Sequence, residues 1–194
     1  MFTGIIKDVG EIVAIEQEGG NLNFTIKSSL SASLNIDQSV AHNGCCLTVI
    51  SKNENEHRVT AIKETLLKTN LSSWKIGSKV NLELCMQMGG RLDGHLVQGH
   101  VDGVGTCLDI EQEDGSWRFT FSHPRELVTV EKGSITVNGT SLTVVDSMAG
   151  QFSVCIIPYT FENTNFNQIN IGDKVNLEFD IIGKYVAKYL ELQK

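Results

Sequence analysis

The sequence predicts an all-β protein made of two tandem, homologous, six-stranded antiparallel Greek-key barrels and a short C-terminal α-helix. The first indication is a repeat at a constant spacing: Gly4 corresponds to Gly99 (99 − 4 = 95), and Asn43-Gly44 and Val80–Glu83 recur at the same interval. Apolar residues alternate with polar ones in both halves, which is the period of a half-buried strand. Asn-Gly pairs mark tight hairpin turns. Because solenoid units are only roughly 20–50 residues long, this longer repeat indicates a duplicated domain.

The first half, residues 1–87, is expected to form one barrel. Phe24 and Ile26 alternate with polar neighbours, as do Val80, Leu82 and Leu84, so both segments are predicted strands. The turn at Asn43-Gly44 opens a further strand, and because Asn and Gly tolerate positive φ we expect this pair to serve only as a turn. A short helical turn is predicted over 31–34.

The second half repeats this plan after a predicted linker over 88–93. The second barrel is expected over 94–182, with strands around Phe119 and over 175–179 and a helical turn over 125–128 after Pro124. Residues 183–194 are predicted to form a helix, because Tyr185, Val186, Tyr189 and Leu190 lie at helical spacing. A helix of about three turns is unstable alone, so it packs either on its own barrel or on partner subunits.

Composition excludes several classes of function. With 41% hydrophobic and 20% charged residues, the 194-residue chain has the composition of an ordinary globular protein. Its net charge of −7 is opposite to what nucleic-acid binding requires. No apolar run approaches the roughly 20 residues that cross a bilayer, and no signal peptide precedes the first strand, so a cytoplasmic location is expected. The five cysteines lack C-x-x-C spacing, so neither disulfides nor a metal site is expected.

Positions that differ between the halves are the candidates for chemistry. Cys46 corresponds to Ser141, and Ile5 corresponds to His100. On a strand, residues two apart share a face, so Cys46 points with Thr48 and Ser141 points with Thr143. Such a face suits a polyol or heterocycle, although a small cysteine is commonly buried filler and strand threonines commonly bond across strands. The imidazole of His100 is a candidate for proton transfer, or else a structural hydrogen-bonding group.

Motifs along the whole chain resemble one family. They are M-F-T-G-I-I at residues 1–6, A-H-N-G-C-C-L-T-V at 41–49, K-E-T-L at 63–66, G-H-L-V-Q-G-H-V at 94–101, N-G-T-S-L-T-V at 138–144 and G-K-Y-V at 183–186. In combination they are specific for the tandem-barrel form of riboflavin synthase. The resemblance implies a transferase that dismutates two molecules of 6,7-dimethyl-8-ribityllumazine, the last step of riboflavin biosynthesis. It implies a homotrimer held by the C-terminal helices, no cofactor, and lumazine synthase as a further candidate partner.

The resemblance also assigns site residues, with Phe2 close to the reacting rings. One lumazine is expected against Gly4, Ile5, Ile6, Cys46, Leu47, Thr48 and a strand made of Thr60, Ala61, Ile62, Lys63, Glu64 and Thr65. The other is expected against Gly99, His100, Val101, Lys132, Ser141, Leu142, Thr143, Ile157, Pro158, Tyr159, Thr160, Phe161 and Glu162. Cys46, His100, Ser141 and Thr143 are the expected catalytic residues: His100 would move the proton, oriented by Ser141 and Thr143, and Cys46 would act on the acceptor. Asp180 is a further candidate.

Two other functions compete with this interpretation. A non-catalytic lumazine or flavin carrier, such as an antenna protein, would share the fold but lack the His of G-H-V and the polar residues of S-L-T-V. Here His100, Ser141 and Thr143 are all present, which favours the enzyme. A flavin-dependent reductase would need a nicotinamide-binding unit, and no G-x-G-x-x-G follows a predicted strand.

Overall fold

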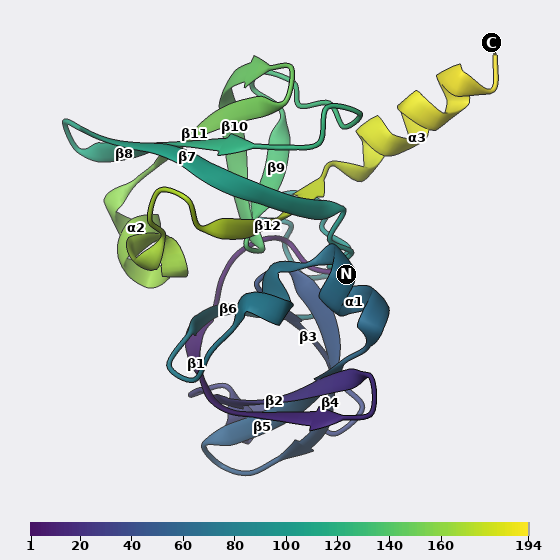
Figure 1. Ribbon diagram of the computed structural model, residues 1–194, viewed down its shortest axis with the longest axis vertical. Coiled ribbons are helices and arrows are strands. Elements are labelled where there is room, and N and C mark those ends of the chain that lie inside the picture. Colours follow the sequence, from purple (N-terminus) through teal and green to yellow (C-terminus); the bar gives the residue numbers. More distant parts are fainter. Residues whose placement is uncertain (194) are drawn as a thin grey trace.

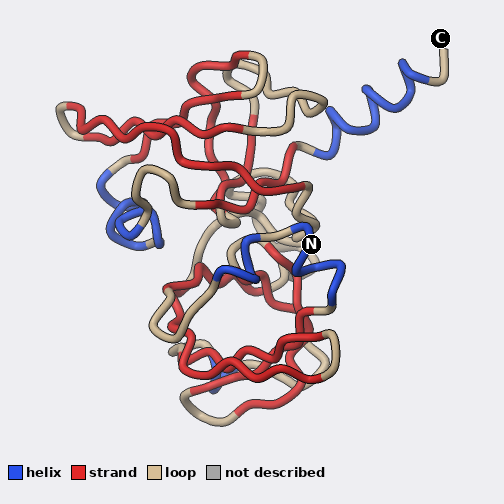
Figure 2. The backbone as a smooth tube through the Cα atoms, in the orientation of Figure 1, coloured by secondary structure: helices blue, strands red, loops and turns tan. Residues whose placement is uncertain are grey.

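The structure, a computed structural model that describes residues 1–193, contains two closed β-barrels, and both lie along the long axis of the molecule (Figures 1 and 2). The all-β class and the two six-stranded barrels are as the sequence predicted. The first barrel contains β1 (Asp8–Glu18), β2 (Asn21–Lys27), η1 (Ser31–Ser33), β3 (Ser39–His42), β4 (Cys45–Lys52), β5 (Glu56–Ala61), α1 (Lys63–Lys68), η2 (Asn70–Ser73) and β6 (Lys79–Leu84).

The second barrel repeats this order of elements. It contains β7 (Gly103–Glu113), β8 (Ser116–Ser122), β9 (Ser134–Val137), β10 (Thr140–Met148), β11 (Gln151–Ile156), α2 (Pro158–Asn163), η3 (Asn165–Gln168) and β12 (Lys174–Phe179). Helix α3 (Ile181–Glu191) follows and projects away from both barrels (Figure 1). Among the helices of residues 1–193, none combines the length and apolar character needed to span a bilayer.

Strand order is the same in the two barrels. The first closes as β1-β2-β5-β4-β3-β6, and the second follows the same circuit of corresponding strands. Because β2 lies beside β5 rather than β3, the connection is a Greek key. Even the irregularities recur: the bulge between Ile12 and Ala14 has its counterpart between Cys107 and Asp109. The two barrels therefore bend at equivalent strand positions, so residues that are equivalent in the repeat lie at the same end of each barrel.

Each barrel has its own apolar core. In the first, Phe24 packs edge-on against Trp74 with ring centroids 5.1 Å apart. In the second, Phe166 packs edge-on against Phe119 at 5.2 Å. Inward-facing residues alternate with outward ones, so Leu47 is buried while Cys46 and Thr48 face away from the core. This alternation confirms that Cys46 and Thr48 share a face.

Asparagines join the two barrels. The side chain of Asn81 accepts a hydrogen bond from the backbone N–H of Asn165 (2.7 Å), and Asn176 accepts one from Asn70 (2.6 Å). These asparagines and their counterparts are 1–6% exposed, and they are Asn43, Asn70, Asn81, Asn138, Asn165 and Asn176. A network of buried amides with this many partners fixes how the barrels sit on each other.

The prediction that Asn43-Gly44 is only a turn is wrong. Asn43 and Asn138 do adopt positive φ (46° each), as turn residues. The two turns also meet back to back: a Cβ atom on Gly139 would lie 2.6 Å from the backbone nitrogen of Gly44. Glycine is therefore required by the contact between barrels as well as by the turn.

Two local predictions are also wrong. The expected strand over 60–65 ends at Ala61, and Lys63 begins α1, a six-residue helix that starts where the strand leaves the barrel. Residues 125–128 form no helix: Leu127 donates to the carbonyl of Pro124 (3.1 Å) in a turn that stops there. The expected turn over 31–34 is present as η1.

A histidine pair is buried inside the first barrel. The Nε2 atoms of His42 and His57 lie 2.9 Å apart, and the Nδ1 of His57 lies 2.9 Å from the hydroxyl of Ser31. Burial lowers the pKa of His42 to about 3, helped by the neighbouring His57, and burial lowers the pKa of His57 to about 4. Both imidazoles are therefore neutral in the folded protein at neutral pH.

We expect the stability of the first barrel to fall as the pH falls from 6.5 towards 5. An unfolded histidine has a pKa of about 6.5, so in this window the unfolded chain binds protons that the folded chain excludes, and the stabilisation present above pH 6.5 is lost. The slope approaches about 1.4 kcal/mol per pH unit for each histidine. Urea titrations at pH 7.5, 6 and 5, followed by Trp74 fluorescence in a Trp117→Phe background, measure it. An unfolding free energy that is constant over this range would contradict the assignment.

Candidate functional site: two mouths built by exchanged segments

The segments that precede the two barrels pair with each other. Phe2 donates to the carbonyl of Val97 (2.7 Å), and Val97 donates back to Phe2 (3.1 Å) in an antiparallel bridge. Both side chains are buried, at 0% and 1% exposure. Phe2 and Val97 are counterparts in the repeat, so this bridge lies on the local axis that relates the two halves.

Beyond the bridge, each segment crosses to the other barrel. Ser141 of the second barrel donates its backbone N–H to Gly4 (2.8 Å), and Cys46 of the first donates to Gly99 (2.8 Å). Both glycines have a φ of 79°, and a Cβ atom on Gly99 would lie 2.7 Å from that of Cys46. The grouping of Gly4 with Cys46 is therefore wrong within the chain: Gly4 lies against Ser141, and Gly99 lies against Cys46.

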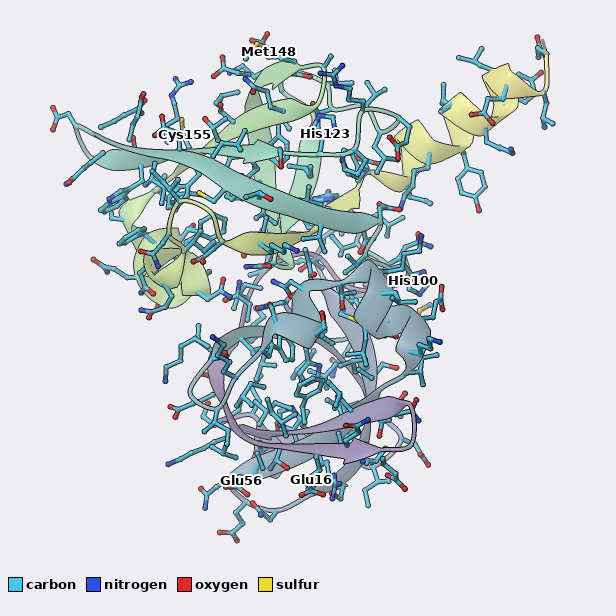
Figure 3. All side chains as sticks on the ribbon, in the orientation of Figure 1. Glu16, Glu56, His100, His123, Met148 and Cys155 are labelled. Carbon is cyan, nitrogen blue, oxygen red and sulfur yellow. The ribbon has the colours of Figure 1, made fainter. Side chains whose placement is uncertain are left out.

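We call the end of the first barrel that is lined by Cys46, Thr48 and the segment 99–101 the first mouth. Val101 packs against the core of the first barrel, although it belongs to the second half of the sequence. Thr48 and His100 are exposed, and Cys46 is half-buried. Figure 3 shows His100 at the level where the barrels meet. Within residues 1–193 its imidazole forms no hydrogen bond, so both ring nitrogens are available to a ligand.

The surroundings of Cys46 disfavour its thiolate form. Burial raises its pKa, against a hydrogen bond with Ser39 that lowers it. Because a thiolate is the nucleophilic form, Cys46 is equipped here as a weak donor or a packing group rather than as a nucleophile.

The second mouth is defined by Gly4, His95, Ser141 and Thr143. The Nδ1 of His95 lies 2.7 Å from the hydroxyl of Ser141. Burial lowers the pKa of His95, and the charge of nearby Asp180 opposes that shift. Ser141 therefore pairs with a neutral His95 and not, within one chain, with His100. Sequence comparison of the halves missed His95 because it has no counterpart at the 95-residue spacing.

The other expected residues lie around the ends of the two barrels. In the first barrel Thr60 and Ala61 end β5, Ile62 precedes α1, and Lys63, Glu64 and Thr65 form its first turn. In the second barrel the corresponding positions are Ile157 before α2 and Pro158–Glu162 within it. Phe161 stacks on Trp117 at 4.0 Å, which holds α2 in place. Lys132 is exposed in the loop before β9.

Two buried glutamates hold the crossing segments. Glu83 accepts hydrogen bonds from the N–H groups of Thr3 and Gly4 and from the Thr3 hydroxyl, at 2.7–2.9 Å. Its counterpart Glu178 accepts from the N–H groups of 98–100 at the same distances. Because three donors converge on each carboxylate, both segments are fixed in their left-handed bend.

The two mouths offer the same framework with unequal chemistry. Each has a strand, β4 or β10, whose first four residues pair with a neighbouring strand on one side only, together with a polar pair two residues apart and a helix start. The first mouth adds an unengaged imidazole and a thiol, and the second adds a serine–histidine pair. Such an arrangement can bind two similar polar heterocycles and treat them differently.

Comparison with known proteins agrees with this geometry. The Lumazine binding domain model matches residues 3–85 and again 98–180. A riboflavin synthase from Actinobacillus pleuropneumoniae is 42% identical over 193 residues, covering 98% of this chain and 90% of that protein. One from Bacillus subtilis (strain 168) is 39% identical with the same coverage, and one from Brucella abortus (strain 2308) is 36% identical over the full length of both chains.

A solved structure has the same fold. LumP complexed with 6,7-dimethyl-8-(1'-D-ribityl) lumazine superposes with a TM-score of 0.84 at 24% identity, over 92% of this chain and 98% of that one. The fold and the two mouths thus define a tandem-barrel protein in which each barrel is a lumazine binding domain. The similarity to riboflavin synthases over the full length of the chain identifies the family within this class of proteins. The chain belongs to the riboflavin synthase family.

Proposed function

We propose that this protein is a riboflavin synthase, a transferase that moves a four-carbon unit between two molecules of 6,7-dimethyl-8-ribityllumazine. The products are riboflavin and 5-amino-6-ribitylamino-pyrimidinedione. The observation that carries the proposal is the pair of mouths on one framework with unequal side chains. Donor and acceptor are identical molecules, so an enzyme can give them different roles only by placing them in different surroundings.

Each mouth has groups that suit one lumazine. Backbone N–H and C=O groups along β4 and β10 can pair with the edge of the pyrimidinedione ring. Threonines and the charged residues that open α1 can reach the ribityl hydroxyls. The two lumazines are proposed to contact the residues predicted for them from the sequence. Residues 4–6 and 132 would contact the lumazine in the second mouth, and residues 99–101 would contact the lumazine in the first mouth.

The chemistry begins with loss of a proton from the C7 methyl group of one lumazine, and the resulting anion attacks the second molecule. His100 is the proposed proton carrier, because its imidazole is exposed and unengaged at the first mouth. At the second mouth, Ser141, paired with His95, and Thr143 polarise the other lumazine. Holding two rings face to face can supply roughly 7–11 kcal/mol of a bimolecular barrier.

The site is proposed to form between subunits of a homotrimer in the cytoplasm. Within one chain the Phe2–Val97 bridge lies between the two mouths. Helix α3 supports assembly, because apolar side chains on it and at its C-cap, Leu192, are solvent-exposed in the single chain: Ile182, Tyr185, Val186, Tyr189, Leu190 and Leu192 are 53–77% exposed. A first mouth of one subunit would then face the second mouth of the next. Lumazine synthase, which would supply the substrate, is a further proposed partner.

The test is conversion of purified protein and 6,7-dimethyl-8-ribityllumazine to riboflavin, followed by flavin absorbance. The competing function is a carrier, which would bind the lumazine tightly and leave it unchanged. The unengaged imidazole of His100 favours the enzyme, because a carrier needs no proton transfer.

His100→Ala should lower kcat by about 10²–10⁴-fold, the usual contribution of a positioned acid or base. Lumazine binding, measured by the change in its fluorescence, should change little, because the backbone of this segment is held by Glu178 whatever the side chain. Turnover equal to the wild type would remove His100 from the mechanism.

A further inference from the structure

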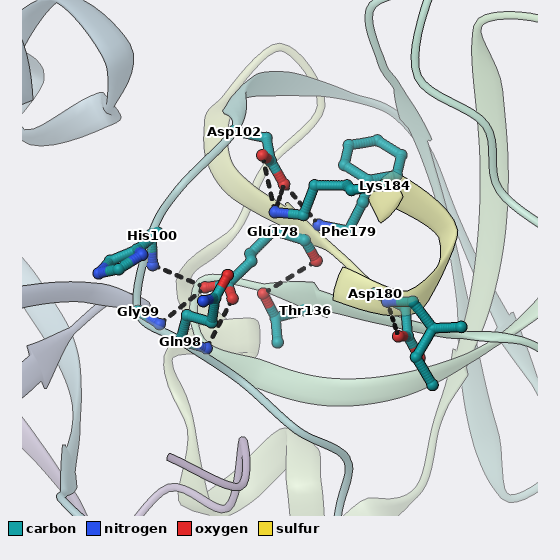
Figure 4. Close-up of polar contacts among 10 residues, drawn as sticks. Gln98, Gly99, His100, Asp102, Thr136, Glu178, Phe179, Asp180 and Lys184 are labelled. Atoms are coloured by element: carbon teal, nitrogen blue, oxygen red, sulfur yellow. Dashed lines mark hydrogen bonds and ion pairs between the residues drawn. The ribbon is translucent and has the colours of Figure 1, made fainter. Parts of the chain in front are cut away.

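The segment that carries His100 is held by Glu178 and, in addition, by an ion pair that has no equivalent in the first half of the chain. Asp102 accepts two contacts from the ammonium of Lys184, at 2.8 and 2.9 Å, and one from the backbone N–H of Phe179 at 2.8 Å (Figure 4). The side chains of Lys184 and Asp102 are 24% and 18% exposed. A half-buried pair with this geometry is stronger than a surface ion pair.

Comparison of the two halves shows that the Lys184–Asp102 ion pair is an addition to the duplicated framework. The hydrogen bonds from residues 98–100 to Glu178 have their equivalent in the hydrogen bonds to Glu83, so they belong to the shared scaffold. Ninety-five residues earlier, Asp102 corresponds to Lys7 and Lys184 corresponds to Gly89, which form no such pair. The pair therefore occurs only in the half that carries His100 and α3.

Lys184 lies in the first turn of α3, and its ammonium reaches back from the helix to the segment 98–102 (Figure 4). Asp180 caps the same turn by accepting from the N–H of Ile182 (3.0 Å). Farther along, α3 leaves the barrel, and Lys188 pairs only with Glu191 of its own helix, where both side chains are largely exposed. Lys184 is thus the basic residue that ties the orientation of α3 to the His100 segment.

We propose that Lys184 is a positioning residue for catalysis: through its ion pair with Asp102, it couples the position of the His100 segment to the orientation of α3. This inference rests on the proposed function. Removing the ammonium would leave the carboxylate of Asp102 beside buried Glu178 without its counter-charge. The two carboxylates would repel each other, and the backbone between His100 and Asp102 would relax. His100 would then sit away from its working geometry while the mouth itself remained.

The experiment compares Lys184→Met, which keeps the length of the side chain and removes its charge, with Lys188→Met on the same helix. Lys184→Met should lower kcat between about tenfold and hundredfold, the effect of a misplacement of about 1 Å. KM for the lumazine should stay within about twofold, because Glu178 still holds the backbone N–H groups of residues 98–100 and the strands that line both mouths are unchanged. Lys184→Arg should restore most of kcat, and Lys188→Met should match the wild type.

Asp102→Asn removes the same pair from the other side and provides a second variant. Its loss of kcat should be no larger than that of Lys184→Met, because it also removes the like charge beside Glu178, and the double variant should lose no more than Lys184→Met. A kcat for Lys184→Met within about twofold of the wild type would overturn the proposal, as would equal losses in kcat for the Met and Arg variants or additive losses in the double variant. Wild-type protein that makes no riboflavin would instead refute the proposed function.

Discussion

Gly139→Ala should lower the free energy of unfolding by about 2–5 kcal/mol, a large effect for a single methyl group. A side chain at a φ of 77° is strained by about 1–2 kcal/mol. The added Cβ would also lie 2.6 Å from the nitrogen of Gly44, on backbone that cannot turn aside, which adds roughly 1–3 kcal/mol. Urea denaturation of the purified variant measures the sum.

Gly115→Ala is the matched control. Gly115 has a φ of 82°, but no atom lies within 4 Å of the position of its Cβ. This variant should lose only the conformational strain, about 1–2 kcal/mol. The difference between the two variants isolates the contact between the barrels. Equal losses would show that the two Asn-Gly turns do not meet.

Deleting residues from Gly183 onward should give monomers with less than about one-hundredth of wild-type activity, because the loss of a shared site removes the pre-orientation of two substrates. The barrels should remain folded, since their cores contain no residue of the deleted segment. Light scattering gives the oligomeric state, and flavin absorbance gives turnover.

Tyr189→Glu separates assembly from the role of Lys184. It places a charge on the exposed apolar stripe of α3 and leaves the Lys184–Asp102 pair in place. We expect it to weaken the proposed trimer and to lose activity in proportion to dissociation. A monomer of either variant with full activity would rule out a site shared between subunits.

The architecture could be predicted from sequence because its signals are local or periodic. Alternation over 80–84 and its repeat over 175–179 specify strands, and the constant spacing specifies two copies of one barrel. The short helices α1 and α2 were missed because each is only one or two turns long and contributes little apolar periodicity. Lys63 looked like the continuation of a strand, but the chain leaves the barrel at Ala61.

The structure groups the predicted site residues differently from the sequence pattern. Gly4 and Gly99 were correctly singled out as counterparts, yet pattern alone assigns each segment to the barrel that follows it. The crossing depends on the Phe2–Val97 bridge and on buried Glu83 and Glu178, contacts between residues about 80–95 positions apart. Nothing periodic marks such contacts. For the same reason the His95–Ser141 pair could not be foreseen.

Mixed trimers of two impaired variants would test most directly whether unlike mouths of neighbouring subunits form the site. His100→Ala damages the first mouth, and Ser141→Ala damages the second. If each site combines one mouth from each of two chains, about one quarter of the sites in a random mixture contain two intact mouths. Co-refolded variants should therefore recover about a quarter of wild-type turnover. Turnover that never exceeds the average of the two separate variants would contradict a shared site.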